Sequence, residues 1–307
     1  MVTDPIADDG LKIFEDNGIE VDKKYDLSKE DLKKEIANYD GVVVRSATKL
    51  RADVLEQAKN LKVIGRAGVG LDNIDLEKAE EMGVKVFNTP EAPSVSVAEL
   101  ALGFMFAFAR HITHADKTMH EGKWNKSEYL GFTLNGKKLG IVGFGSIAKE
   151  LAKRAIALGM EVGVYSRFSG GQPAIDEAKD YGCKIYQSID DLLKDAQIIS
   201  LHIPATPKTK NIINKTKIEL MRKDAMLINT ARGDLIDEDA LLEALKNDKI
   251  AGAALDVYKQ EPLENKELIN YEGNLILTPH IGSQTEETQT SAATGIAEKM
   301  CNFLKNK

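Results

Sequence analysis

The chain has 307 residues, 43% of them hydrophobic and 29% charged, a composition typical of globular proteins that excludes a disordered or fibrous one. Its 41 basic and 48 acidic residues give a net charge of −7 with the two signs interspersed, so we expect no nucleic-acid partner. Cys183 and Cys301 lie far apart without metal-ligand spacing, which excludes a disulfide framework and structural zinc, and we expect no metal.

The beginning of the sequence does not resemble an export signal. Residues 1–10 contain Asp4, Asp8 and Asp9 and lack an apolar segment. The longest apolar run, Leu100 to Ala109, has ten residues, well short of the roughly 20 that a membrane-crossing helix requires. We therefore expect a cytoplasmic protein without a membrane partner.

The first third of the chain alternates short β-branched runs with helical stretches. The strand-like runs are 42–44, 62–64 and 84–86, and the helical stretches are 52–59 and 75–81. Residues 2–5 are expected to form only the end of a very short opening strand. Near-continuous apolar strands indicate burial on both faces, which favours a parallel sheet covered by helices.

A long helical pattern follows, from about Ser94 to His120, unbroken by proline, and we interpret it as the bridge between two domains. After Asn135-Gly136 the strand and helix rhythm restarts, with strand-like segments at 138–142, 161–165, 183–186, 197–201 and 225–229. The last helical stretch, Gln284 to Leu304, is expected to cross back to the first domain. The sequence therefore predicts two α/β domains, the first of them discontinuous.

A glycine motif opens the second domain. The strand-like segment 138–142 runs into Gly143-Phe144-Gly145-Ser146-Ile147-Ala148 and then into a helical stretch from Lys149 to Leu158. In a dinucleotide-binding turn the first glycine allows the tight turn, the second admits the pyrophosphate, and a small third residue lets the helix pack closely. The placement between strand and helix favours dinucleotide binding over a purely structural turn.

The end of the second strand bears on the choice of dinucleotide. The motif expects an acidic residue there to bind the ribose 2′-hydroxyl, whereas this chain has Tyr165-Ser166-Arg167. Without the carboxylate, Arg167 could pair with a 2′-phosphate, which allows NADP as well as NAD. In the alternative interpretation Arg167 is a solvated loop cation, and other contacts hold NAD.

Three polar segments follow later strands, at 229–233, 256–262 and 278–282. Ligands of open α/β sheets sit beyond the carboxyl ends of the strands, so Arg232, Glu261 and His280 could converge there. Hydride transfer to a 2-keto acid needs the chemistry of these three residues. The guanidinium of Arg232 can bind the carboxylate, His280 can donate the proton, and Glu261 can orient the imidazole and raise its pKa. Alternatively Arg232 and His280 are structural caps or surface groups. Glu261 would then start a turn with Pro262, and Asp256 would be a cap or hinge carboxylate.

The sequence as a whole resembles the D-isomer-specific 2-hydroxyacid dehydrogenase family, most closely its short phosphoglycerate dehydrogenase members. Nearly the entire chain takes part in the resemblance, in one order. Besides the segments already described, the matching stretches are Val44-Arg45-Ser46-Ala47-Thr48-Lys49, Gly65-Arg66-Ala67-Gly68-Val69-Gly70-Leu71-Asp72-Asn73-Ile74-Asp75 and Ser96-Val97-Ala98-Glu99.

The resemblance implies two doubly wound parallel-sheet domains. One is a flavodoxin-like substrate domain made of residues 1–97 and 284–307, and the other is a Rossmann cofactor domain, 98–283. It also implies a homodimer, to which the long helix and the loop around Trp124 contribute, and a catalytic set of Arg232, Glu261 and His280. The implied cofactor contacts are Gly143, Phe144, Gly145, Ser146, Ile147, Ser166, Arg167, His202, Pro204, Thr209, Thr230, Ala231, Arg232, Asp256, His280 and Gly282.

The substrate contacts implied by the resemblance lie in the first domain. Backbone amides of the loop Arg66 to Gly70 would hold the substrate carboxylate in a nest that glycines make possible. Arg45 and Lys49 follow a strand and could face a phosphate, which favours 3-phosphoglycerate and hence serine biosynthesis. The predicted substrate-binding residues are Arg45, Ser46, Lys49, Gly68, Val69, Gly70 and Asn73.

The sequence departs from the family pattern in places, and two other functions stay open. Ser146 stands where the family often has Arg, Ala148 replaces the third Gly, and Ser166 replaces the usual Asp, which leaves NAD or NADP undecided. We expect no C-terminal regulatory domain. One alternative is a glyoxylate or hydroxypyruvate reductase using NADPH; the other, from a different class, is a nucleotide-sensing regulatory scaffold.

Overall fold

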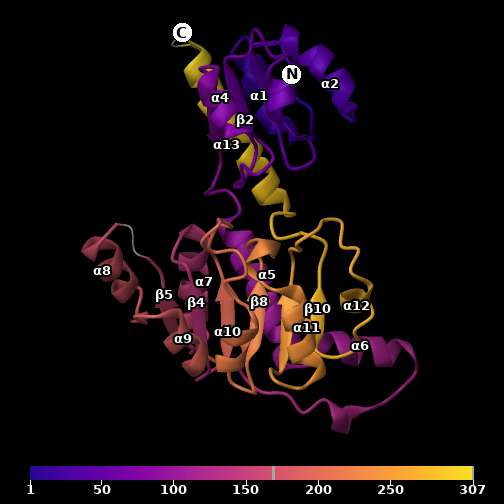
Figure 1. The fold of residues 1–307 in the computed structure, drawn as a ribbon, viewed down its shortest axis with the longest axis vertical. Helices are drawn as coiled ribbons and strands as arrows, with labels where there is room; N and C mark the ends of the chain where they lie inside the picture. The colour runs from indigo at the N-terminus through magenta and orange to yellow at the C-terminus, as the bar shows by residue number, and fades with distance from the viewer. Residues whose placement is uncertain (168–169, 306–307) are drawn as a thin grey trace. The chain divides into compact units, whose positions relative to one another are not determined.

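The computed structural model describes residues 1–167 and 170–305 and divides into two compact units. The smaller unit comprises Met1–Pro93 and Ser283–Lys307, and the larger unit comprises Ser94–Gly282 (Figure 1). The first division falls four residues before the predicted boundary at 97/98. It does so because helix α5 begins at Ser94 and belongs whole to the larger unit.

The larger unit is built on a parallel seven-stranded sheet. Its strands are β4 (Lys138–Val142), β5 (Glu161–Tyr165), β6 (Lys184–Ile185), β7 (Ile198–Leu201), β8 (Met226–Asn229), β9 (Gly252–Leu255) and β10 (Leu275–Leu277). Their spatial order is β10-β9-β8-β7-β4-β5-β6, which is the Rossmann order extended by one strand. The strand order therefore reverses between β4 and β7, where such sheets bind their ligands.

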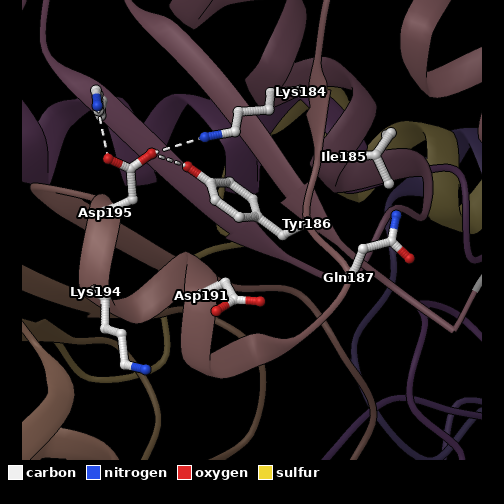
Figure 2. Close-up of a pocket in the computed structure, with 8 residues that line it drawn as sticks. Lys184, Ile185, Tyr186, Gln187, Asp191, Lys194 and Asp195 are labelled. Atoms are coloured by element: carbon white, nitrogen blue, oxygen red, sulfur yellow. Dashed lines mark hydrogen bonds and ion pairs between the residues drawn. The ribbon is translucent and has the colours of Figure 1, made fainter.

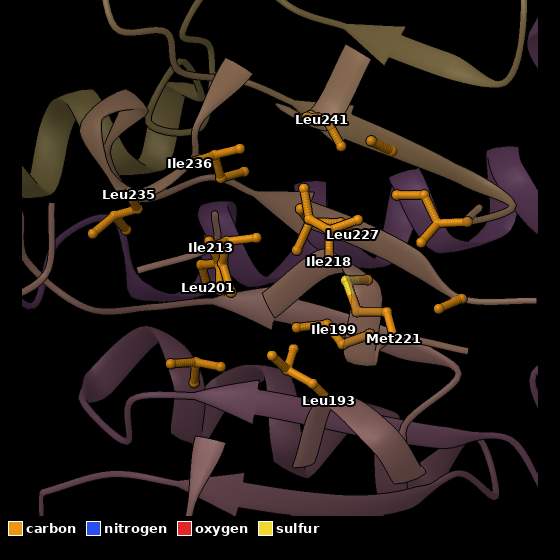
Figure 3. Close-up of a cluster of buried hydrophobic side chains, with 14 of the residues drawn as sticks. Leu193, Ile199, Leu201, Ile213, Ile218, Met221, Leu227, Leu235, Ile236 and Leu241 are labelled. Atoms are coloured by element: carbon orange, nitrogen blue, oxygen red, sulfur yellow. The ribbon is translucent and has the colours of Figure 1, made fainter. Parts of the chain in front are cut away.

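Helices cover both faces of this sheet, because alternate strand residues point to opposite sides. On one face Ile199, Leu201 and Leu227 pack with residues of α9, α10 and α11 such as Ile218 (Figure 3). On the other, strand residues such as Ile228 pack with α5 and α7. The helices are α5 (Ser94–Ala109), α6 (Ile112–His120), α7 (Ser146–Ala157), α8 (Gln172–Asp180), α9 (Ile189–Asp195), α10 (Lys215–Leu220), α11 (Glu238–Lys246) and α12 (Lys266–Ile269), with short 3-10 turns at Lys126–Glu128 and Gly233–Leu235.

The prediction of one helix over 94–120 is wrong, because the structure breaks it into α5 and α6, with a bend of 64°. His111 between them has a positive φ of 54°. The carbonyl of Ala109 accepts the N–H of Phe132 at 2.9 Å, so a distant segment takes the bond that a continuing helix would use. In the described chain no single helix is long and apolar enough to cross a membrane, although α5 and α6 pass that test as a bent pair.

The smaller unit has a parallel sheet in the order β1-β2-β3. Its elements are β1 (Gly41–Val44), β2 (Val63–Arg66), β3 (Lys85–Asn88), α1 (Asp8–Asp16), α2 (Lys29–Glu35), a 3-10 turn (Ile36–Asn38), α3 (Ala52–Leu55), α4 (Leu76–Glu81) and α13 (Glu286–Lys305). The opening strand is a parallel bridge at Val2, which pairs with both Val43 and Lys23. Counting these bridges, the strand order is 2-1-3-4-5, the flavodoxin-like order that the fold prediction named.

Helix α13 returns to the smaller unit and packs on β2 and α1. A Cβ added at Gly10 would lie 2.7 Å from the backbone of Ala293, so the close approach of the helix there requires glycine, and a Cβ added at Gly65 would press on the side chain of Met300. The helix buries Ile296, Ala297 and Met300 against this unit. The two ends of the chain thus share one hydrophobic core.

Candidate active site

The turn after β4 contains two glycines, and glycine is present at the two positions for different reasons. Gly143 has a φ of 101° and donates its N–H to Tyr165 at 2.8 Å, and a Cβ there would overlap the carbonyl of His202. Gly143 is therefore required by the fold itself. It also joins the ends of β4, β5 and β7 at the point where the strand order reverses.

Gly145 has no such local requirement. Its φ is −87°, which any residue adopts, and a Cβ there would meet no described atom within 4 Å. Gly145 is the N-cap of α7 and supplies no side chain to the first-turn amides, which leaves them to an outside acceptor. The fold does not require glycine at this position, and the amides that follow it are uncapped. Gly145 is therefore suited to the close approach of a pyrophosphate.

Other predicted cofactor residues gather at the ends of β7 and β8. The hydroxyl of Thr230 is buried and, among the described residues, has no hydrogen-bond partner, so it can serve a bound group. His202 lies 2.8 Å from Ser200, and burial lowers its pKa to about 4, which keeps the imidazole neutral. Thr209 donates to the carbonyl of Pro204 at 2.7 Å and closes the turn after β7.

The loop that carries Arg232 is held from both sides. The side chain of Asn229 accepts from the N–H of Ala231 at 3.1 Å and donates to the carbonyl of Arg232 at 2.8 Å. A Cβ on Gly233 would overlap the carbonyl group of Tyr258, so this loop touches the segment after β9. The first two polar segments of the sequence are thereby packed together.

The structure brings His280 and Glu261 into direct contact. Nδ1 of His280 lies 2.8 Å from a carboxylate oxygen of Glu261, and the other oxygen accepts the N–H of Tyr258 at 3.1 Å. The hydrogen bond that His280 donates to Glu261 raises the pKa of His280, and burial only partly opposes it. Burial alone would raise the pKa of Glu261, but the bond and charge of His280, with the charge of Arg232, lower it.

Arg232 belongs to the same group of charges. Its guanidinium lowers the pKa of both Glu261 and His280, and it donates to the carbonyl of Ala231 at 2.6 Å. The three residues of the predicted catalytic set thus share one electrostatic site in the larger unit. A fixed cation beside an imidazole and its carboxylate can bind an anionic substrate and exchange a proton with it.

Asp256 holds the loop that presents His280. The side chain is 1% exposed, and its carboxylate accepts from Thr278 Oγ1 at 2.6 Å and from the N–H groups of Ile281 and Gly282 at 2.8 Å each. The sequence suggested a cofactor contact or a hinge carboxylate at this position. The bonds in the structure make Asp256 a positioning residue for the loop.

Tyr258 is a positioning residue that the sequence analysis missed. Its hydroxyl lies 2.8 Å from the carbonyl of Thr278 and 3.0 Å from that of Leu255, and burial raises its pKa to about 12. It therefore ties the start of the His280 loop to β9. Its place between Asp256 and Glu261 in one polar segment was the available signal.

In the smaller unit, two side chains hold the loop after β1. Asp4 is buried and accepts the N–H of Arg45 at 2.6 Å and the hydroxyl of Thr48 at 2.6 Å. Nδ2 of Asn73 donates to the carbonyls of Arg45 and Thr48 at 2.8 and 2.7 Å. Asn73, a predicted substrate contact, is thus committed to the loop, and Asp4 is a loop-holding residue that the sequence analysis did not single out.

This loop carries the predicted cations and Ser46. Ser46 and Lys49 are exposed, whereas Arg45 is partly buried and donates to the carbonyl of Pro5 at 3.2 Å. Burial lowers the pKa of Arg45, partly offset by the charge of Asp4.

In the glycine loop after β2, fewer backbone amides are available to a substrate carboxylate than the sequence predicted. Gly68 has a φ of 139°, and its N–H donates to Thr89 Oγ1 at 2.8 Å, so that amide is not available to a carboxylate. The carbonyl of Val69 accepts from Asn88 at 2.7 Å, which fixes the loop. Among the described residues the N–H groups of Val69 and Gly70 have no acceptor, and these two amides are the ones that can receive an anion.

Comparisons with known proteins find matches to both the sequence and the fold. The family model described as D-isomer specific 2-hydroxyacid dehydrogenase, NAD binding domain, matches residues 102–282. The chain is 46% identical to a D-3-phosphoglycerate dehydrogenase of Methanocaldococcus jannaschii over 100% of this chain and 57% of that protein. It is 43% identical to a hydroxypyruvate reductase of Thermotoga maritima, over 99% of this chain and 97% of that protein. The crystal structure of the TT0316 protein from Thermus thermophilus superposes with a TM-score of 0.89 at 34% identity, covering 100% of this chain and 96% of the other.

Proposed function

Since the chain belongs to the D-isomer specific 2-hydroxyacid dehydrogenase family, we propose that it transfers a hydride between C2 of a small hydroxy acid and a nicotinamide dinucleotide. The observation that carries the proposal is the 2.8 Å pair of His280 and Glu261 beside the charge of Arg232. The chain spans 57% of the length of the phosphoglycerate dehydrogenase that it matches, so the activity rests on the site rather than on that name.

The bond to Glu261 assigns the proton chemistry of His280. Nδ1 donates to the carboxylate, which leaves Nε2 to face the substrate oxygen. In the oxidative direction Nε2 accepts the hydroxyl proton, and in the reductive direction it returns that proton to the keto oxygen. The bound nicotinamide supplies the hydride acceptor or donor. The raised pKa keeps His280 a competent acid near neutral pH.

Arg232 and Asp256 have different tasks. The guanidinium of Arg232 binds the substrate carboxylate and polarises the keto oxygen, because it is a fixed cation with several donors. Asp256 touches no reacting atom in this scheme and keeps the loop of His280 in place. Gly145, the uncapped amides of α7 and Thr230 hold the dinucleotide.

We infer 3-phosphoglycerate as the substrate. Arg45 and Lys49 place two cations on the loop after β1, and Asp4 and Asn73 make that loop rigid. A phosphate dianion is the group that such a pair recognises. The amides of Val69 and Gly70 provide a second anion site in the same unit.

A hydroxypyruvate or glyoxylate reductase is the second candidate. The Thermotoga maritima relative, a hydroxypyruvate reductase by name, matches this chain over nearly its whole length. Neither hydroxypyruvate nor glyoxylate carries a phosphate, so this function would leave Lys49 without a role in binding.

Steady-state kinetics with 3-phosphohydroxypyruvate, hydroxypyruvate and glyoxylate separate the two candidates. For a phosphoglycerate dehydrogenase, Lys49→Ala should raise KM for 3-phosphohydroxypyruvate about tenfold, the effect of one charge-assisted hydrogen bond, and leave glyoxylate unchanged. Lys59→Ala, which removes an exposed lysine after α3, is the matched control. Equal KM values for phosphorylated and unphosphorylated acids in the unchanged protein would reject 3-phosphoglycerate.

We also propose a homodimer in the cytoplasm. Helix α6 buries none of its residues, and Figure 1 shows the segment after it extending away from the sheet. Trp124 is 80% exposed and Leu130 90% exposed. Phe106, Ile112 and Met119 add to this apolar surface. A second copy of the chain would cover it. Cys183 and Cys301 are buried free thiols, as a reducing compartment favours.

Light scattering of the purified protein tests the dimer. Leu130→Glu should give a monomer because it places a charge in the apolar contact, whereas Leu158→Glu, at an exposed leucine that follows α7, should not. A monomeric unchanged protein would refute the proposal.

A further inference from the structure

The turn that carries Glu261 follows β9 and lies at the surface. Lys259, Gln260 and Glu261 are all exposed in it. Such a turn keeps one conformation only where its backbone groups have fixed partners. The N–H of Tyr258 donates to the carboxylate of Glu261 at 3.1 Å, but this bond lies within the turn. The residues after Tyr258 therefore need a partner from another part of the chain.

Glu238, in the first turn of α11, provides that partner. The N–H of Lys259 donates to Oε1 of Glu238 at 2.7 Å. Among the described residues this is the one hydrogen bond of the Glu238 carboxylate. A carboxylate is a stronger acceptor than a neutral oxygen, so the bond is well suited to fix an exposed backbone. It joins α11 to the turn after β9.

The beginning of α11 is itself fixed, so it can serve as an anchor. Asp237, the N-cap of the helix, accepts the N–H of Ala240 at 3.2 Å and donates its own N–H to the carbonyl of Ile213 at 3.0 Å. Ile236 and Ile213 form a parallel bridge, and both side chains are buried. Glu238 therefore extends to the turn from a rigid base.

The same stretch of chain carries Arg232. Between Arg232 and Glu238 it contacts the turn a second time, at Gly233, where a Cβ would overlap the carbonyl group of Tyr258. The bond of Glu238 thus completes the contact between the Arg232 loop and the turn. It determines where Glu261 lies relative to Arg232.

Asp195 shows how a carboxylate of this unit serves the fold alone. It lines a hollow beside β6 and accepts from Lys184 and Tyr186 (Figure 2). It also accepts from Lys138 at 2.6 Å. These donors belong to β4, to β6 and to the segment after β6, and none of these segments carries a residue of the predicted catalytic set. Glu238 differs because its partner is the turn of Glu261.

From these contacts we propose that Glu238 is a positioning residue of the proposed reaction, which holds the turn after β9 so that Glu261 meets His280. The inference rests on the proposed function, because these are the residues that move the proton there. Glu238 touches no reacting atom in that scheme. Without its bond to Lys259 the turn is free to move, Glu261 no longer keeps its 2.8 Å contact, and the imidazole loses its orientation.

Three substitutions separate the reach of the Glu238 side chain from its charge. Glu238→Gln keeps an acceptor oxygen at the same reach without the charge. Glu238→Asp keeps the charge on a shorter side chain, and Glu238→Ala removes both. Asp239→Ala is the matched control, because Asp239 is also an acidic residue in the first turn of α11 but is exposed and makes no bond to the turn among the described residues.

The first measurement is a nuclear magnetic resonance titration of the full chain, without substrate or nucleotide. It follows the ring signals of His280, identified as those absent from His280→Asn. The charged groups that face this ring are Glu261, Asp256 and Arg232, and all three are kept. Because the bond to Glu261 raises the pKa of His280, the Ala and Asp variants should titrate at lower pH than the unchanged protein. The Gln variant and the control should titrate as the unchanged protein does.

The second measurement is steady-state kinetics on the same proteins. The Ala and Asp variants of Glu238 should lower kcat about tenfold and change KM less than twofold, since the loss affects the proton step and not substrate binding. Glu238→Gln should retain at least half of kcat. Urea denaturation shows whether each variant is folded, and if Glu238→Ala is not, the Asp and Gln variants still decide.

Several results would overturn the inference. They are a Glu238→Asp variant with the titration and kcat of the unchanged protein, a Gln variant as impaired as the Ala variant, and an equal loss in Asp239→Ala. Each would mean that charge, and not the bond to Lys259, is what counts. If the unchanged protein transfers no hydride, the proposed function fails, and the titration still tests the contact by itself.

Discussion

The substitution Asp256→Asn tests whether a buried carboxylate holds the loop of His280. The asparagine oxygen can still accept from Thr278 and Ile281, but its amide group would face the N–H of Gly282, donor against donor. One hydrogen bond to a charged group is lost, at about 1.5–3 kcal/mol, and two are weakened because the acceptor becomes neutral. We expect the free energy of unfolding to fall by about 3 kcal/mol.

The same substitution should affect catalysis through geometry. A loop that no longer fixes His280 lowers kcat by at least tenfold, since a misplacement of about 1 Å costs as much or more. Urea denaturation followed by circular dichroism measures the stability, and steady-state kinetics measures kcat. Asp239→Asn is the control, because this exposed carboxylate should change the stability by less than about 0.5 kcal/mol. A variant as stable and as active as the unchanged protein would refute the reasoning.

Three further substitutions probe other parts of the site. Glu261→Gln should shift the acid limb of the pH dependence of the oxidation rate to lower pH. Without the carboxylate the pKa of His280 falls, so the neutral imidazole that accepts the proton persists to lower pH. The value of kcat should fall about 100-fold. Gly145→Val should weaken dinucleotide binding about 100-fold in a titration, yet change stability by less than about 1 kcal/mol, since no described atom opposes its side chain. Asn73→Ala removes two hydrogen bonds from the loop after β1. It should lower the free energy of unfolding, measured by thermal denaturation, by about 1–3 kcal/mol and raise KM for phosphorylated substrates.

Each of these has a contrary result. An unshifted pH profile for Glu261→Gln would mean that another group sets the titration. Full dinucleotide affinity in Gly145→Val would place the pyrophosphate elsewhere. Unchanged stability and KM in Asn73→Ala would show that Asp4 holds the loop without it.

The fold class and the family were predictable because their signals are local, and both are confirmed. Gly143 needs its positive φ for a turn between one strand and the next helix, and that need is visible within six residues of sequence. Strand β4 was predicted with its observed bounds, since apolar residues continue up to the glycine. Parallel order follows from the same alternation of strands and helices.

Features that depend on distant contacts could not be predicted from neighbouring residues. Asp256 bonds to residues 22 to 26 positions later, and Asp4 to residues 41 to 44 positions later, so neither role shows in its local pattern. The break after Ala109 arises from Phe132, with no proline or other local signal at the site. The commitment of the Gly68 amide to Thr89 is of the same kind.

The catalytic set stays a prediction about chemistry, although the structure places its members together. Arg232, Glu261 and His280 follow three different strands, and their convergence comes from parallel strands ending at one edge of the sheet. The proposed choice of substrate depends on side chains such as Lys49, which is exposed and whose proposed partner is a small molecule and not another part of the chain.

Isotope transfer tests hydride transfer most directly. The protein is incubated with 3-phosphoglycerate deuterated at C2 and oxidised nicotinamide dinucleotide, and the reduced nucleotide is analysed by mass spectrometry. We predict one deuterium in the reduced nicotinamide, formed at least 100-fold more slowly by His280→Asn although that variant binds the nucleotide normally. A reduced nucleotide without deuterium, or an equal rate in the variant, would contradict the account.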